Sequence, residues 1–164
     1  MALFKGKNLK LFILIEREDA DTVPYTDDDY KMIGTENEIT ISLKSDNETY
    51  NTKSYGNVVD AGPRQMTIKG TAETVVENDA GHAALIAADG TTIGFQVRDV
   101  SGRSEANLAA ATDATDKVYI EGSFLVSETE EKASATGLVE FTFTLESSGI
   151  FTRNLPARAY VPAA

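Results

Sequence analysis

Alternation of apolar and polar residues marks six segments of this chain as β-strands. The clearest is residues 138–146, near the C-terminal end. In it apolar and polar side chains take turns: Val139, Glu140, Phe141, Thr142, Phe143, Thr144, Leu145 and Glu146. Successive side chains of a strand point to opposite faces of a sheet. One face of this strand therefore belongs in a core, and the other face is polar.

Five further segments read as strands. They are residues 9–15, 39–44, 66–71, 93–98 and 118–126. Clusters of Gly, Asn, Asp and Ser separate many of them, as is typical of turns. The pattern predicts a mainly β fold, an antiparallel β-sandwich or partly open barrel.

One helix is expected beside the sheet. Residues 78–89 are rich in alanine, with Asn78 or Asp79 as N-cap and Gly90 as the stop. Gly81 weakens the start of this helix. A second alanine-rich stretch, residues 104–117, suits a short helix and a loose connection equally well.

Three segments do not fit a compact β domain. The connection 16–38 has the highest density of acidic residues in the chain, and the connection 46–65 has two tyrosines, two glycines and a proline. Loops above about 15 residues usually carry a function or lack order. The segment 150–164 contains two prolines, which disfavour a sheet interior, so we expect an extended C-terminal arm there.

Composition narrows the choice of function. A length of 164 residues fits one domain, 1–164. The sequence has no cysteine, so it forms no disulfides. It has 26 acidic and 15 basic residues, a formal charge of −11, which argues against nucleic-acid binding by the overall field. No apolar run has the length of a bilayer span, and the apolar stretch near the N-terminus reads as the first strand rather than as a signal peptide.

Motifs for chemistry are not found. His82 is the only histidine, so neither a zinc site nor a Ser-His-Asp triad has its usual ligands or partners. The acids of residues 16–38 lack the spacing of an EF-hand loop. Phosphate-binding glycine loops are missing as well. We therefore expect no catalytic residue, no metal and no cofactor, although a carboxylate pair for hydrolysis stays open because its spacing is spatial.

The order of the elements points to a family. Its most specific pieces are MTIKGTAE before the helix and the closing pair YIEGSFLVSETEEKASATGLVEFTFTLESSG. Over roughly residues 5–150 the chain resembles the major tail tube protein of long, non-contractile-tailed bacteriophages. It is also similar to the tube subunit of gene transfer agents. The insert 16–38 and the segment after residue 150 depart from the family pattern.

The resemblance implies a structural protein of the virion tail, made and assembled in the host bacterial cytoplasm. Such subunits are β-sandwiches with one helix that form rings of six, and the rings stack into a tube that conducts DNA to the host. The expected partners are further copies of the chain, the tape measure protein, the tail terminator and the distal tail or baseplate proteins. DNA would pass transiently, and this chain would not insert into a membrane.

Two groups of residues become candidates under this interpretation. Residues expected to face a negatively charged lumen are Thr67, Lys69, Thr71, Glu73, Glu140, Thr142, Thr144 and Glu146. Residues expected to contact other subunits are Tyr50, Tyr55, Phe151, Arg153, Arg158 and Tyr160. Three alternatives remain: another ring former, such as a secretion-system tube or head-tail connector; a monomeric β-barrel binding module; and a carboxylate-dependent hydrolase.

Overall fold

The computed structural model describes most of the chain. The described residues are 8–18, 21–33, 36–52, 56–73, 80–108, 110–133, 135 and 140–162. Their helices and strands are β1 (Leu9–Leu14), η2 (Asp27–Asp29), β2 (Tyr30–Met32), β3 (Glu36–Thr52), β4 (Gly56–Glu73), α1 (Ala80–Ala87), β5 (Thr92–Asp99), η3 (Glu105–Asn107), β6 (Lys117–Lys132) and β7 (Glu140–Ala159).

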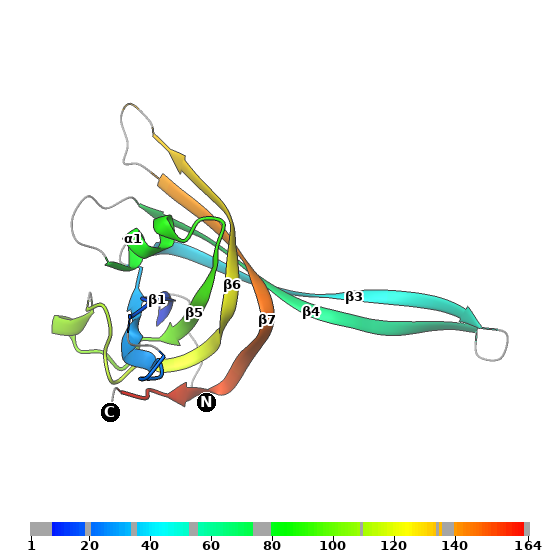
Figure 1. Ribbon diagram of the computed structural model, residues 1–164, viewed down its shortest axis with the longest axis horizontal. Helices are drawn as coiled ribbons and strands as arrows, with labels where there is room; N and C mark the ends of the chain where they lie inside the picture. The colour runs from blue at the N-terminus through cyan, green and yellow to red at the C-terminus, as the bar shows by residue number, and fades with distance from the viewer. Residues whose placement is uncertain are drawn as a thin grey trace.

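All seven described strands belong to one antiparallel sheet. Its order is β2-β1-β5-β6-β7-β4-β3. The sheet is curved, and α1 lies on its concave side against β1 and β2 (Figure 1). This confirms the predicted mainly β fold with one flanking helix. The sheet does not close into a barrel.

The main core lies on one face of the sheet. Alternate residues of five strands and one helix fill it: Leu11, Ile13, Met66, Ile68, Leu85, Phe95, Val97, Phe124, Phe141, Phe143 and Leu145. The rings of Phe95 and Phe124 meet edge to face with centroids 6.1 Å apart. Burial of this apolar surface is the main force that holds the sheet in its curved form.

The other face of β1 and β5 carries a second, polar layer. Phe12 and Arg98 point to this face, and the Arg98 guanidinium carbon lies 4.2 Å from the centre of the Phe12 ring. Arg98 and Arg103 both bind Asp116, which is itself buried. The loop between β5 and β6 is thereby tied onto the sheet.

A long hairpin leaves the body at the end of the β4–β7 pairing. β4 pairs with β3 along its whole length, but with β7 only between Thr67–Glu73 and Glu140–Glu146. At the parting point the Ser147 hydroxyl accepts a hydrogen bond from the Met66 N–H at 2.9 Å. Beyond this point β3 and β4 project alone (Figure 1). The prediction of a long loop at 46–65 is therefore wrong, because most of this stretch is strand.

The C-terminal segment also differs from its prediction. Residues through Ala159 continue β7 and pair with β6, so the expected arm is wrong for 150–159, which stay in the sheet. Pro156 is accommodated because this half of β7 has a neighbour on one side only, where a missing N–H costs little. Among the described residues of the second alanine-rich stretch, Glu105–Asn107 form a short 3-10 helix and the others are not helical.

One buried carboxylate fastens the C-terminal strand to the acidic connection. Asp27 accepts hydrogen bonds from Arg158 at 2.9 and 3.0 Å, from Gln96 at 3.0 Å and from the Val161 N–H at 2.7 Å. Burial raises the pKa of Asp27, but these hydrogen bonds outweigh burial and hold its pKa below the ordinary value. The acidic connection 16–38 thus includes η2, β2 and the start of β3, and its buried acid is paired.

Replacing Gly81 in α1 tests the packing of the helix on β2. A Cβ at this position would lie 2.2 Å from the Met32 carbonyl oxygen, which is backbone and cannot turn away. Gly81→Ala should lower the free energy of unfolding by about 1–3 kcal/mol, although helix propensity alone favours alanine by about 1 kcal/mol. Urea unfolding measures this change. The control Ala83→Gly, at an exposed site of the same helix, should cost only about 1 kcal/mol. A more stable Gly81→Ala protein would contradict the observed contact.

Replacing Asp27 tests the fastening of the C-terminal strand. Asp27→Asn should lower the free energy of unfolding by about 2–4 kcal/mol at pH 7, because the Arg158 and Val161 donors lose their charged acceptor.

The same carboxylate predicts how stability depends on pH. Because the folded pKa of Asp27 is lowered, its contribution is complete above the ordinary Asp pKa of about 3.9 and is lost as pH falls through the folded value. Between about pH 5 and pH 2, the free energy of unfolding should fall less for Asp27→Asn than for the unmodified protein. Equal losses in the two proteins would show that Asp27 does not govern acid stability.

Candidate functional site

A polar surface extends over four neighbouring strands. It covers the face of β3, β4, β7 and β6 opposite the core, and we call it the polar panel. Its polar members with described side chains are Glu38, Thr40, Ser42 and Lys44 on β3, Gln65, Thr67, Lys69 and Thr71 on β4, Glu140, Thr142, Thr144 and Glu146 on β7, and Glu128, Glu130 and Lys132 on β6.

The strand register orders these side chains in rows. One row runs Thr40, Lys69, Thr144 and Glu128, and the next runs Glu38, Thr71, Thr142 and Glu130. Residues directly opposite in adjacent antiparallel strands have side chains on the same face and about 5 Å apart. The panel is thus a grid of positions that the strand register fixes.

The residues predicted to face a lumen all fall on this grid. They form four directly opposed pairs between β4 and β7: Thr67–Glu146, Lys69–Thr144, Thr71–Thr142 and Glu73–Glu140. The side chain of Glu73 is outside the described set, and its position is known from the backbone register alone. The structure brings the set together on one face, but their facing a lumen stays a prediction. Sequence alone could not pair residues 67–73 with 140–146, because this contact is distant along the chain.

The described panel side chains carry a net negative charge. Five carboxylates stand on it, at Glu38, Glu128, Glu130, Glu140 and Glu146, against the three cations Lys44, Lys69 and Lys132. A shallow hollow of about 270 Å³ lies in the middle. Polar side chains line much of it: Glu38, Thr40, Lys69, Thr71, Thr142 and Thr144. Threonine and glutamate without a positive cluster make a wet surface that does not hold polyanions.

Both lateral edges of the panel lack a strand partner among the described residues. β3 is the last strand of the sheet, so its outer edge is unpaired. β6 pairs with β5 as far as Leu125, and Val126 exchanges backbone hydrogen bonds with Gly90 and Thr91, which leaves 127–132 with β7 as the one described neighbour. Unpaired edges are templates for pairing with another chain. The panel can therefore join a further strand on each side.

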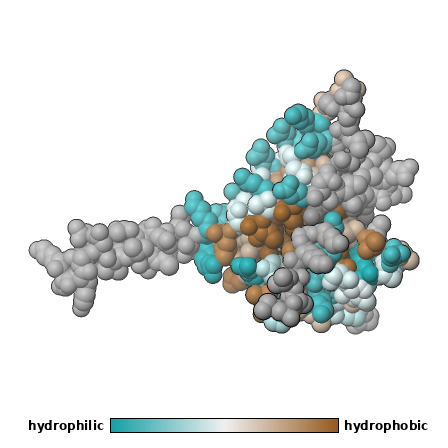
Figure 2. All heavy atoms as spheres, turned by 180° about the vertical axis from the view of Figure 1, so that it is seen from behind, coloured by the Kyte–Doolittle hydropathy of each residue, from teal (hydrophilic) through white to brown (hydrophobic). Residues whose placement is uncertain are grey.

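The apolar surface near the hairpin is a second feature of this region. Figure 2 shows apolar side chains gathered where the hairpin leaves the body, bordered by polar ones. Ile39, Ile41 and Leu43 of β3 are only partly buried at this margin of the core. Apolar margins of this kind favour contact with another protein surface.

The residues predicted to contact other subunits have mixed positions. Arg158 and Tyr160 are engaged within their own chain, Arg158 with Asp27 and Glu121 and Tyr160 with Asp28 and Thr112. Proximity to Asp28 and burial raise the pKa of Tyr160 to about 12, with burial the larger cause.

The remaining predicted contact residues are less engaged or not described. Phe151 is half-buried over Gly122, and the exposed Arg153 donates from Nε to the Tyr119 hydroxyl at 3.0 Å. The side chain of Tyr50 is not described, and Tyr55 lies outside the described residues.

Other kinds of site receive no support from the described part of the chain. Within it, no group of three or more metal-binding side chains comes together. No helix in the same residues is long and apolar enough to cross a membrane. His82, the one histidine of the sequence, lies in α1, and its side chain is outside the described set.

Comparison of the sequence with known families gives no match. No family model matches the chain, and no curated protein matches it in sequence. The comparison of structures is informative instead, because folds persist after sequences have diverged.

Several solved structures share this fold. A subunit of the native gene transfer agent (GTA) virion matches with a TM-score of 0.62 and 16% identity, covering 93% of this chain and 99% of that one. The tail of the empty GTA particle, with C6 symmetry, matches with a TM-score of 0.60, 16% identity and the same coverage. The SPP1 tail tube matches with a TM-score of 0.67 and 14% identity, covering 93% of this chain and 80% of that one.

A tube-terminating protein also matches. The cap of the anti-feeding prophage (AFP) tube has a TM-score of 0.54 and 9% identity, and covers 94% of this chain and 93% of that one. At these identities the likeness concerns the fold. The chain has the fold of phage tail tube proteins. Its described residues form one curved β-sheet, one α-helix and a projecting hairpin.

Proposed function

We propose that this chain is the structural subunit of a tail tube. Copies join side by side into rings, and the rings stack into a hollow tube. The observation that carries the proposal is the polar panel, a polar wall with an apolar core behind it and an unpaired strand edge on each side.

Ring closure follows from these two edges. When β3 of one copy pairs with the 127–132 part of β6 in the next copy, the panels form a continuous sheet. Such a contact joins different surfaces of the two molecules, so it generates a ring if the rotation closes. Closure removes the exposed edges. The C6 symmetry of the similar GTA tail supports six copies per ring.

The panel faces the bore in this assembly. A duplex carries one negative charge per about 1.7 Å of its axis, and lysine or arginine contacts would hold it by counterion release. Five carboxylates against three lysines per described panel repel the duplex, so the DNA slides instead of adhering. The threonines keep the wall hydrated without adding positive charge.

The remaining partners follow from the same role. The bore holds a tape measure protein before the DNA passes, and the two ends of the tube contact a tail terminator and distal tail or baseplate proteins. The tube is built in the host bacterial cytoplasm, and its location thereafter is the virion tail. The role is structural, not enzymatic, and the conducted DNA goes to the host cell.

A second candidate has an observation of its own. The fold is also similar to the cap that terminates the AFP tube. A terminator forms one ring and stops, whereas a tube subunit stacks without limit. The number of stacked rings in a purified preparation distinguishes the two roles.

Electron microscopy of the purified protein tests the proposal. Negative stain at increasing protein concentration should show hollow tubes of constant diameter and variable length. Single rings at every concentration would favour the terminator. Monomers that persist at high concentration would overturn both candidates and favour a binding module.

A lysine in the panel tests the bore. Thr142 lies in a central strand of the panel, with Thr71 directly opposite. In a six-membered ring, Thr142→Lys would add six cations to each layer of the bore and slow DNA release from assembled virions by about tenfold or more. Tube number and length should stay normal.

A lysine away from the panel provides the control. Ser101 is exposed in the loop after β5, and Ser101→Lys adds the same charge at a site outside the panel. DNA release from this variant should match that of the unmodified virion. Equal rates for Thr142→Lys and Ser101→Lys would show that the panel does not face the DNA.

A further inference from the structure

One apolar side chain projects from the body just beyond the base of the hairpin. Ile150 is 93% exposed. Between Ser147 and Phe151 three residues of β7 stand opposite the single Ser123 of β6, and Gly149 in this bulge has a φ of 90°. Bulges redirect side chains away from the sheet. Ile150 is therefore held outward by the backbone, which suits an anchor that fills a pocket of a partner.

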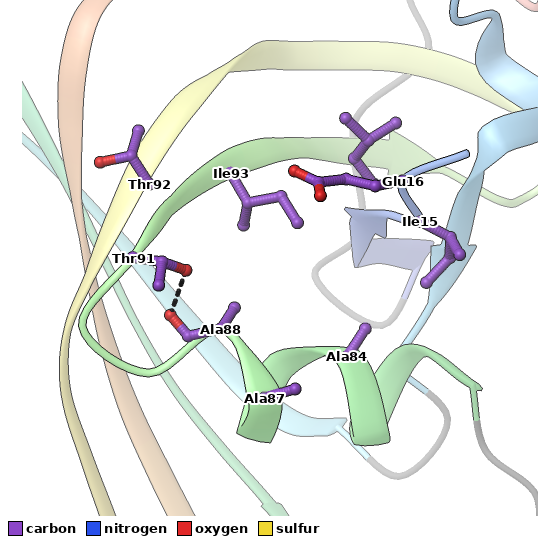
Figure 3. A pocket seen from close by; sticks show the side chains of 9 residues that line it. Ile15, Glu16, Ala84, Ala87, Ala88, Thr91, Thr92 and Ile93 are labelled. Carbon is purple, nitrogen blue, oxygen red and sulfur yellow. Dashed lines mark hydrogen bonds between the residues drawn. The ribbon is translucent and has the colours of Figure 1, made fainter. Parts of the chain in front are cut away.

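A matching pocket lies beside α1. Its volume is about 380 Å³, within the range of about 300–1,000 Å³ found for binding sites. Figure 3 shows side chains of the end of β1, of α1 and of the start of β5 around it. The lining is mainly aliphatic: Leu14, Ile15, Ala84, Ala87, Ala88 and Ile93, with Glu16, Thr91 and Thr92 as its polar members. An isoleucine side chain is small enough to enter it.

The charges beside the two features are opposite. Arg153 is exposed three residues along the same strand from Ile150, and Glu16 is exposed at the pocket. In a chain with a formal charge of −11, two copies repel each other at long range. A local Arg–Glu pair offsets that repulsion and fixes which surfaces meet.

The two features lie on different sides of the molecule. Ile150 follows Ser147, the residue at which the hairpin parts from β7, and the hairpin projects from this side (Figure 1). The helix α1 stands on the side of the body away from the hairpin (Figure 1). A projection on one side and a pocket on the other give a contact that repeats from copy to copy in one direction.

We infer that Ile150 of one copy inserts into the α1 pocket of a second copy in the adjacent ring, with Arg153 of the first beside Glu16 of the second. This contact joins ring to ring and is separate from the edge-to-edge pairing that closes each ring. The inference rests on the proposed function, because it assumes that copies of the chain stack.

Cysteine crosslinking tests the contact, because the natural chain has no cysteine. The axial pair is Ile150→Cys with Ala87→Cys in one chain, and the lateral pair is Ser42→Cys with Glu128→Cys. A short bismaleimide is added to assembled tubes, and the products are separated under denaturing conditions. The axial pair should give a ladder that continues past the ring size. The lateral pair should give a ladder that ends at the ring size.

The outcomes separate this inference from the proposed function. Tubes that crosslink through the lateral pair but give no ladder with the axial pair would overturn the α1 contact and leave the tube role intact. If the unmodified protein forms no tubes, the tube role and the contact both fail. A long axial ladder supports both.

Side-chain replacement gives an independent readout. Ile150→Asp should raise the protein concentration needed for tube growth by about tenfold or more, because an aliphatic side chain is lost from each ring-to-ring contact. The control Leu108→Asp changes another exposed aliphatic residue, 57% exposed, and should not alter tube growth. Ile150→Asp growth equal to that of the control would contradict the insertion.

A charge exchange tests the polar half of the contact. Glu16→Arg and Arg153→Glu should each impair tube growth when present alone, since each places like charges together. The chain with both changes should recover growth, because the pair is restored with opposite sense. A double variant that grows no better than the single ones would show that Glu16 and Arg153 do not meet.

Discussion

The antiparallel pairing of β4 with β7 is the contact on which the rest of this structure depends. It spans seven residue pairs, from Thr67–Glu146 to Glu73–Glu140, and joins parts of the chain more than 65 residues apart. On one face it aligns Ile68, Phe143 and Leu145 for the core. On the other face it aligns the threonines and glutamates of the polar panel. Where the pairing ends, at Met66 and Ser147, the hairpin and the outer half of β7 separate.

Local pattern predicted much of this fold. The alternation in residues 138–146 and 66–71 and the alanines of α1 identified their elements, because a half-buried strand and a short helix both leave a period in the sequence. The hairpin was missed, since a two-stranded ribbon outside the core needs no apolar alternation. The end of β7 was missed because Pro156 argued against a strand, and sequence does not show that this half is an edge.

The sequence predicted a polar face on the strand of residues 138–146 but not the residues that stand opposite it. Alternation placed Thr142 and Thr144 on a polar face, while only the register reveals that Thr71 and Lys69 stand directly opposite them. The polar layer around Arg98 and Asp27 left no signal at all. Its members are charged residues, which are normally exposed, and Asp27 meets Arg158 from 131 positions away. For the same reason the sequence predicted that Tyr160 and Arg158 contact other subunits, whereas both bind residues of their own chain.

The proposed tube requires the panel of β3, β4, β7 and β6 to line the bore. A density map of the assembled tube, at a resolution that traces the strands, tests it most directly. We expect a bore lined by these four strands from every copy, with Glu128, Thr142 and Thr144 pointing inward and a negative potential along the wall. A bore lined by other strands, or a strongly basic bore, would contradict it.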